Sequence, residues 1–207
     1  MKLIFDIETD GFLEECSKVH SIVIKDIETN QVFSYHGDKI GRGLMLLNGA
    51  NLLVGHNILK FDLAVLKKLY PRQYDIKAEI LDTLLVSRLI WTNQKELDFQ
   101  KKELPLNLAG RHSLESWGYR LGLRKGEFAK TNDFANWSEE MQKYCEQDVE
   151  VTHELYNLIQ KQKYSPEAIR LEHDFARCIH LQEAHGFHFD VASAKKLYAS
   201  LANRRLE

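Results

Sequence analysis

The stretch KLIFDIETD, residues 2–10, joins a run of apolar residues directly to three carboxylates. Its apolar start favours a β-strand. Side chains alternate between the two faces of a strand, so Asp6 and Glu8 point the same way, roughly 6.6 Å apart. Two carboxylates on one face repel each other unless a proton or a cation intervenes, and hard oxygen ligands suit Mg²⁺ or Mn²⁺. The alternative is that both acids are solvated turn residues.

The composition is that of an ordinary globular chain. Its 207 residues fit one domain with an appendage, and 44% hydrophobic residues can form a substantial core. Lys and Arg total 28 against 30 acidic residues, which gives a net charge of −2. This charge argues against a protein that coats nucleic acid through many phosphate contacts. It is compatible with a protein that grips only the end of a strand.

Cysteine usage and hydropathy indicate the compartment. Cys16, Cys145 and Cys178 are widely spaced and form no C-x-x-C pair, which favours a reducing cytosol. The N-terminus lacks the pattern of a signal peptide, and no apolar run reaches about 18 residues. The sequence therefore predicts a soluble cytoplasmic protein that has no membrane partner.

Hydrophobic periodicity predicts an α/β domain in the first two thirds of the chain. We expect strands at residues 2–5, 19–26, 31–36 and 51–54, with a hairpin turn at residues 28–30. We expect helices around residues 61–69, 84–90 and 112–121. The intervening segment 92–111 is polar and contains Pro105 and Gly110, so we expect it to be a loop.

Three further helices are expected after residue 137. The first begins at Ser138, a favourable N-cap. The second begins at Ser165-Pro166 and ends near Gly186, and the third begins near Asp190. The apolar stripe of the first of these helices consists of Cys145, Val149, Thr152, Tyr156 and Ile159.

Two more motifs extend the acidic pattern. In GHNILKFDLAVL, residues 55–66, Asn57 precedes Asp62 at the start of an amphipathic helix. Taken alone, Asp62 can simply favour the helix N-terminus, and Asn57 can be a turn residue. In YCEQD, residues 144–148, Tyr144 and Asp148 lie one turn apart on one helix face. Their alternative is a surface Asp beside a partly buried Tyr, but the ordered combination of three motifs favours a common site.

Asp6, Glu8, Asp62 and Asp148, together with Tyr144, resemble the four-acid signature of the DEDD 3′→5′ exonucleases, in the subclass with a tyrosine in the third motif. This resemblance implies a ribonuclease H-like fold: a mixed five-stranded sheet flanked by helices, here with a helical C-terminal tail. Four other segments are similar to family A DNA polymerases of short-tailed phages: residues 81–91, 112–122, 125–128 and 185–201. We therefore expect an exonuclease domain at residues 1–163 and, at 164–207, a helical segment that leads toward a polymerase domain.

The resemblance also implies roles for the five residues of the signature. Two Mg²⁺ or Mn²⁺ ions per site clamp the attacking and departing oxygens in such enzymes. Asp6 is expected to bridge both ions, and Glu8 and Asp148 to complete the tighter site. Asp62 is expected to hold the second ion, largely through water, and Tyr144 to orient the attacking water.

The expected substrate contacts are Phe12, Asn57 and Lys60. Phe12 is expected either to stack on the terminal base or to pack in the core. Asn57 and Lys60 are expected either to contact a sugar or phosphate of the strand or to be structural. His56, Trp117 and Tyr119 are interpreted as structural residues. Cys145 is interpreted as a buried residue without a catalytic role.

The favoured function is a proofreading exonuclease that acts on the 3′ end of single-stranded DNA. Its partner is the polymerase domain of the same longer chain, and a phage-encoded protein would act in the host-cell cytoplasm. One alternative is an exoribonuclease of the same subclass, against which the polymerase-like segment GFHFD at residues 186–190 argues. Another is a catalytically silent structural domain, against which the presence of all four acids argues.

Overall fold

The computed structural model describes residues 1–101, 104–123 and 134–206. The polymerase-like segment at residues 125–128 lies outside the described residues. Contacts divide the chain into two units, Met1–Ala176 and Arg177–Glu207. The first unit contains the whole sheet and every residue of the acidic pattern.

The first unit is built on the mixed five-stranded sheet that the resemblance implies. The strands are β1 Lys2–Thr9, β2 Val19–Asp26, β3 Val32–His36, β4 Leu52–Gly55 and β5 Glu79–Asp82, in the order β3-β2-β1-β4-β5. β1 pairs antiparallel with β2 and parallel with β4. It is therefore the central strand, and the expected strand at residues 2–5 continues through both acids of the opening motif.

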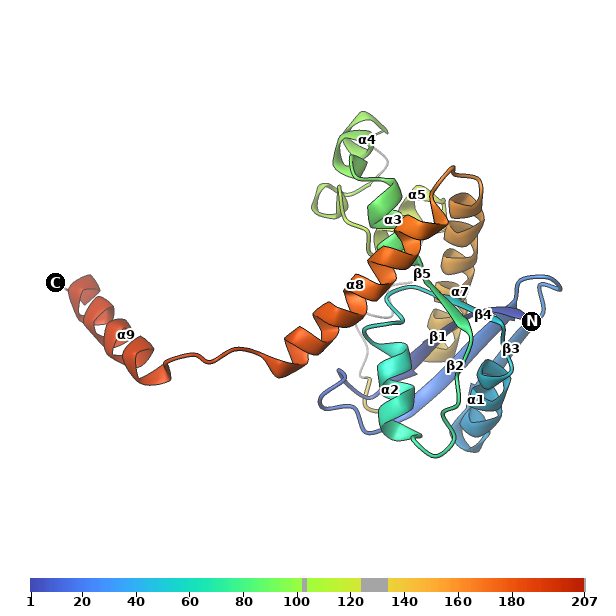
Figure 1. Cartoon of the computed structure of the whole chain (residues 1–207), viewed down its shortest axis with the longest axis horizontal. Coiled ribbons are helices and arrows are strands. Elements are labelled where there is room, and N and C mark those ends of the chain that lie inside the picture. The colour runs from blue at the N-terminus through green and yellow to red at the C-terminus, as the bar shows by residue number, and fades with distance from the viewer. Residues whose placement is uncertain (102–103, 124–133, 207) are drawn as a thin grey trace. The chain divides into compact units, whose positions relative to one another are not determined.

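Helices cover both faces of this sheet, as Figure 1 shows for α1 and α2 in front and α7 behind. In the first unit, the bounds of the described helices are η1 Gly37–Lys39, α1 Ile40–Asn48, α2 Asp62–Leu69, α3 Thr83–Ile90, α4 Gln94–Lys101, η2 Leu106–Leu108, α5 Leu114–Arg120 and α7 Glu139–Gln160. α8 Pro166–His185 begins in the first unit, and α9 Val191–Leu206 lies in the second. The expected helix starts at Ser138 and Ser165-Pro166 are confirmed.

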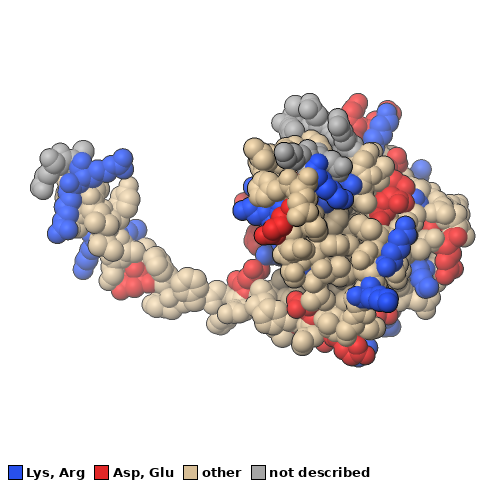
Figure 2. Space-filling model, turned by 90° about the horizontal axis from the view of Figure 1, so that it is seen from above, with Lys and Arg blue, Asp and Glu red and all other residues tan. Residues whose placement is uncertain are grey.

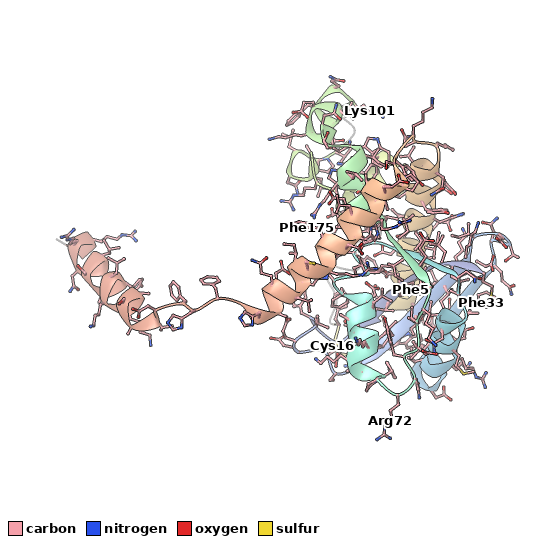
Figure 3. The ribbon with its side chains drawn as sticks, in the orientation of Figure 1. Phe5, Cys16, Phe33, Arg72, Lys101 and Phe175 are labelled. Atoms are coloured by element: carbon pink, nitrogen blue, oxygen red, sulfur yellow. The ribbon has the colours of Figure 1, made fainter. Side chains whose placement is uncertain are left out.

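The alternation of β1 decides which of its residues meet which helices. Leu3, Phe5 and Ile7 belong to the buried cluster that includes α1 and α2; Figure 3 labels Phe5 in the interior of the unit. Ile4 belongs to the opposite cluster, with Cys145 and other residues of α7. Because Asp6 and Glu8 follow Ile4 at intervals of two, they face α7.

The expectation of a loop at residues 92–111 is wrong, because α4 and η2 lie within this segment. Buried polar contacts, rather than an apolar stripe, stabilise α4. Arg120 of α5 donates to both carboxylate oxygens of Asp98, at 3.0 and 2.8 Å. Gln94 and the backbone N–H of Gly110 also donate to Asp98, each at 2.8 Å. A bidentate pair of this kind connects residues 22 apart, so helical periodicity within the segment gives no sign of it.

The helices after residue 163 belong partly to the first unit. His173 and Ala176 of α8 are buried. The Nε2 atom of His173 accepts the backbone N–H of Asp82 at 2.8 Å, and its Nδ1 donates to the carbonyl of Ile169 at 2.8 Å. The domain boundary at residue 163 stays a prediction, and this contact bears on where an independent domain can end.

We expect a chain that ends at residue 176 to be more stable than one that ends at residue 163. The shorter chain loses the hydrogen bond from Asp82 to His173, worth about 1 kcal/mol, and the burial of the first turns of α8. Urea unfolding of both truncated chains, followed by circular dichroism, measures the difference. Equal free energies of unfolding would show that α8 contributes nothing to the first unit.

The second unit consists of the end of α8 and of α9. Gly186, with a φ of +67°, follows α8, and Asp190 accepts the backbone N–H of Ser193 at the start of α9. The expected helix limits near Gly186 and Asp190 are therefore confirmed. Among the residues that the structure describes, no helix combines the length and apolar character needed to span a lipid bilayer.

Candidate active site

The four acids come from three separate segments of the first unit. Asp6 and Glu8 lie on β1, Asp62 is the first residue of α2, and Asp148 lies on α7. Glu8, Asp62 and Asp148 are 8%, 4% and 6% exposed, whereas Asp6 is half-buried. Carboxylates are rarely buried to this extent unless they are paired or hold a metal ion. The burial therefore argues against the alternative of solvated turn and surface residues.

The thiol of Cys145 lies among three of these carboxylates. Its Sγ is 3.5 Å from the carbonyl oxygen and 3.6 Å from Oδ2 of Asp6, so the thiol can donate to either oxygen. Burial raises the pKa of Cys145 well above its ordinary value, and the charges of Asp6, Glu8 and Asp148 raise it further. The burial of Cys145 was predicted from the sequence, but its contact with Asp6 was not.

Asp62 closes the site from the side of α2. The last parallel pair between β1 and β4 is Ile4 with Val54, so the backbone N–H of Ile7 lies beyond the end of that pairing. This N–H donates to Oδ1 of Asp62 at 3.2 Å. The hydrogen bond brings the second motif to the strand that carries the first motif.

The surroundings of Asp62 disfavour its charged form. Burial raises the pKa of its carboxyl to about 7, and the nearby charges of Asp82 and Asp148 contribute to the increase. A carboxyl with this pKa is protonated about half of the time at neutral pH. A divalent cation among the acids would stabilise the charged form and thereby offset this increase in pKa, so the cluster fits a metal site.

Asp82 is a further buried carboxylate near the site, which the sequence did not single out. It caps α3 by accepting the backbone N–H of Leu84 at 3.0 Å, and it accepts those of Asn57 and Leu59 at 2.9 and 3.1 Å. Burial raises its pKa as well. With its oxygens bonded to three backbone N–H groups, Asp82 anchors the loop that leads to Asp62.

The loop between β4 and α2 has a demanding backbone. Asn57 has a φ of +65°, in the left-handed region that Asn tolerates better than most residues. A Cβ at Gly55 would lie 2.2 Å from the side chain of Ile58 and 3.0 Å from the carbonyl oxygen of Phe5. The backbone of Asn57 thus has the structural role that the sequence left open, while its side chain lines a cavity beside the loop.

Tyr144 lies on α7 one turn before Asp148 and is half-buried. α7 contacts both β1 and β2, and the hydroxyl of Ser21 on β2 donates to Gln142 of α7 at 2.8 Å. The same helix therefore carries Tyr144, Cys145 and Asp148 against the strand of Asp6 and Glu8.

A pocket of about 370 Å³ opens beside Glu8. Phe12 lines it and is 78% exposed, so the alternative that Phe12 packs in the core is wrong. The lining is mostly apolar and aromatic: Ile7, Glu8, Thr9, Gly11, Phe12, Phe61 and Phe134. A planar aromatic ligand could enter this pocket and reach the acids through Glu8.

A second cavity, of about 420 Å³, lies beside the loop between β4 and α2. It is lined by His56, Asn57, Leu84, Arg88, Gly110, Arg111, His112, Ser113 and Leu114. Burial lowers the pKa of His112 to about 4, and the charges of Arg120 and Arg88 lower it further. Arg88 and Arg111 bring positive charge to the lining, so this cavity suits an anion.

The remaining sequence predictions have mixed placements. Lys60 is exposed within the loop between β4 and α2, and Trp117 is buried, as expected for a core residue. His56 is half-buried, and its Nδ1 lies 2.9 Å from the hydroxyl of Thr83. Arg88 and Arg111 were not singled out, although both lie in or beside segments of the phage polymerase resemblance. That position is the only sequence signal that pointed to them.

A comparison of the whole sequence with protein families gives one clear result. The profile of the RNase_H superfamily matches residues 3–160. The chain belongs to the RNase H superfamily. The match spans the sheet and all three acidic motifs, which agrees with the mixed sheet and its flanking helices.

Within this superfamily, the chain is similar to the DNA-directed DNA polymerase of Escherichia phage T7. They are 34% identical over an alignment of 253 positions, which covers 99% of this chain. The chain spans 36% of the length of that polymerase.

Two solved structures of other proteins share the fold. Brucella melitensis NrnC with bound Mg²⁺ has a TM-score of 0.62 and 16% identity, over 92% of this chain and 89% of NrnC. Escherichia coli RNase D, described as an exoribonuclease involved in structured RNA processing, has a TM-score of 0.55 and 12% identity, over 85% of this chain and 45% of RNase D. The first unit therefore shares the overall fold of both structures.

Proposed function

We propose that this chain is the 3′→5′ exonuclease part of a phage-type family A DNA polymerase, which removes nucleotides from the 3′ end of single-stranded DNA. The observation that carries the proposal is the convergence of four carboxylates from three segments. The thiol of Cys145 lies close enough to Asp6, Glu8 and Asp148 for their charges to raise its pKa. Asp62 accepts a hydrogen bond from the backbone N–H of Ile7, the residue after Asp6. Residues so far apart in sequence, buried and mutually repulsive, are best explained by a shared function.

In this proposal Asp6, Glu8, Asp62 and Asp148 would hold two Mg²⁺ or Mn²⁺ ions, and Asp6 would serve as a ligand to both. Such a pair, when bound, supplies an activated nucleophile and stabilises the leaving oxygen in phosphodiester hydrolysis. The donor set fits the ions, because all four side chains offer hard oxygen atoms. Repulsion among the acids supports the same assignment.

The other residues of the site would position the metal ligands and the attacking water. The hydroxyl of Tyr144 would orient the attacking water by a hydrogen bond. The thiol of Cys145 restrains the carboxylate of Asp6 by donating to it, and Asp82 fixes the loop that presents Asp62. A preorganised arrangement of this kind lowers the reorganisation needed during the reaction.

Two cavities, one beside Glu8 and one beside the loop that precedes Asp62, suggest how a strand end binds. The terminal base would stack on Phe12 in the aromatic pocket next to Glu8. A phosphate farther along the strand would lie in the second cavity, near Asn57, Arg88 and Arg111. Lys60, exposed within the loop between β4 and α2, would contact the sugar-phosphate backbone of the DNA strand. Such a local basic site needs no basic surface; Figure 2 shows acidic and basic side chains interspersed on the face of the first unit that is seen there.

DNA is favoured over RNA by the similarity to the phage T7 polymerase, which covers nearly the whole chain. A polymerase domain of the same longer chain is then the proposed partner, and residues 177–207 would lead toward it. The second unit exposes Phe187, Phe189 and Tyr198, which supports this role. A phage-encoded polymerase would act in the cytoplasm of the host cell.

The test is an incubation with 5′-labelled single-stranded DNA or RNA of the same sequence, in Mg²⁺, in Mn²⁺ or in excess EDTA. We expect DNA ladders that shorten from the 3′ end in either metal, and no cleavage in EDTA until metal is restored. Full activity in EDTA would exclude the metal mechanism. A labelled mononucleotide released at once would reverse the polarity.

The same assay separates the two alternatives. Faster degradation of RNA than of DNA would favour an exoribonuclease. Failure to cleave either substrate, with a correctly folded protein, would favour a silent structural domain. A variant that lacks Asp6 and Glu8 serves as the control for contaminating nucleases.

A further inference from the structure

Outside the candidate active site, α7 carries a second group of possible metal ligands: Glu150, His153 and Glu154. At spacings of three and four residues their side chains share one helix face. One oxygen of each carboxylate and a nitrogen of the imidazole lie within 4.8 Å of one another. The nearest active-site residue in the sequence is Asp148, two positions before Glu150.

The imidazole of His153 is buried and aimed at the two carboxylates. His153 is 8% exposed, and its Nδ1 has no hydrogen-bond partner among the residues that the structure describes. This atom lies 3.9 Å from Oε1 of Glu150 and 3.7 Å from Oε1 of Glu154, beyond hydrogen-bond distance. A buried polar atom without a partner is costly, and its cost calls for an explanation.

A simple ion pair does not supply that explanation. Burial lowers the pKa of His153, and the nearby charge of Lys25 lowers it further. Lys25 itself binds Glu150, with its Nζ 2.6 Å from Oε2. The imidazole is therefore neutral at pH 7, and Oε1 of Glu150 remains directed toward it.

The distances fit a cation held between the three side chains. Two ligand atoms about 2.1 Å from a tetrahedral ion lie about 3.4 Å apart. The observed separations of 3.9 and 3.7 Å are close to this value. Glu150 and Glu154 have side chains 43% and 45% exposed, so small rotations can shorten the distances and an ion can enter from solvent.

We propose that Glu150, His153 and Glu154 form a binding site for one Zn²⁺-like transition-metal ion, separate from the active site. One imidazole nitrogen and two carboxylates suit Zn²⁺ and its neighbours, whereas Mg²⁺ prefers an all-oxygen set. The ion takes the lone pair of Nδ1, so the proton of the neutral imidazole resides on Nε2. The amide nitrogen of Asn157 lies 3.4 Å from Nε2 and donates to Oε1 of Glu154 at 3.3 Å. When the amide turns over, its oxygen accepts a hydrogen bond from Nε2–H, and Oε1 of Glu154 is released for the ion.

The site also has a structural consequence. The three ligands lie within five residues, so a bound ion would cross-link successive turns of α7, the helix that carries Tyr144 and Asp148. The ion pair between Lys25 and Glu150 connects this part of α7 to β2. Binding of the ion should therefore raise the thermal stability of the first unit.

The test is a Zn²⁺ titration of the whole chain in excess Mg²⁺, which keeps oxygen-rich sites occupied. Calorimetry gives the affinity, and ¹⁵N NMR of the histidine side chains shows which nitrogen binds. We expect one Zn²⁺ to shift the Nδ1 resonance of His153, identified by its loss in His153→Gln. Changing a residue that only supports a ligand weakens metal binding by about 10–100-fold, so His153→Gln and Glu154→Gln should weaken it by at least tenfold.

The matched control is His188→Gln, which removes an exposed histidine of the second unit and should leave Zn²⁺ affinity unchanged. Because His153 is buried, melting curves without metal will show whether His153→Gln is folded. The half-exposed Glu154 provides a variant that does not disturb the core. Zn²⁺ binding that leaves the His153 resonances unmoved, or that is equally tight in Glu154→Gln, would overturn the proposal. Neither result would affect the proposed nuclease activity.

Discussion

The Asp6→Ala/Glu8→Ala double variant is expected to lose cleavage by at least a factor of about 10²–10³. That factor is the scale for deleting one electrostatic stabiliser, and a bridging ligand should contribute more. The metal-free double variant should be as stable as the wild type or more stable, because the two carboxylates repel each other and face Asp148 on α7. Nuclease assays in Mg²⁺ and thermal melts in EDTA measure both effects.

Asp10→Ala is the matched control, since it removes the third carboxylate of the same stretch. The hydroxyl of Ser17 and the backbone N–H groups of Ser17 and Lys18 donate to Asp10 and hold its pKa well below the usual range. This variant should therefore melt at a lower temperature and retain cleavage. The opposite responses would assign one acid of KLIFDIETD to the fold and two to function.

Two results would contradict this division. Near-normal cleavage by the double variant would mean that Asp6 and Glu8 are solvated turn residues. A large loss of metal-free stability would mean that their hydrogen bonds, such as the one from the thiol of Cys145 to Asp6, hold the fold together.

The placement of the acids was predictable because it follows from local rules. Alternation along β1 puts Asp6 and Glu8 on one face, and the apolar stripe of α7, from Cys145 to Ile159, faces inward. Ser138 begins α7 by accepting the backbone N–H of Met141 at 3.1 Å. Each of these features depends on residues within a few positions of one another.

The features that the sequence did not predict depend on distant residues or on weak local signals. The contact of Cys145 with Asp6 spans 139 positions, and that of His173 with Asp82 spans 91. α1, with the sequence IGRGLMLLN, contains two glycines, which lower helix propensity. β5 has only four residues, too few to show an alternating pattern.

The second large effect concerns Asp62 and the dependence of stability on pH. Burial raises the pKa of its carboxyl from 3.8 to about 7, so the metal-free folded protein binds this proton more tightly than the unfolded chain does. The resulting stabilisation is fully present below pH 4 and is lost as the pH rises through 7. Raising the pKa from 3.8 to about 7 corresponds to a difference of about 4 kcal/mol between the two limits of pH.

Asp62→Asn isolates this contribution, because asparagine keeps an oxygen for the N–H of Ile7 and does not titrate. In EDTA, we expect the variant and the wild type to have similar free energies of unfolding near pH 4, and the variant to be more stable near pH 8. Asp82 and Asp148 are present in both proteins, so the difference between the two curves reports Asp62. Urea unfolding at a series of pH values gives both curves.

Divalent metal should reverse the order of the two proteins at high pH. Mg²⁺ binds the ionised carboxylate, so it should stabilise the wild type most above pH 7 and should stabilise Asp62→Asn less. A difference in stability that stays constant from pH 4 to pH 8 would show that Asp62 titrates normally. The argument from its burial to a metal site would then fail, and the case for the site would rest on the double variant alone.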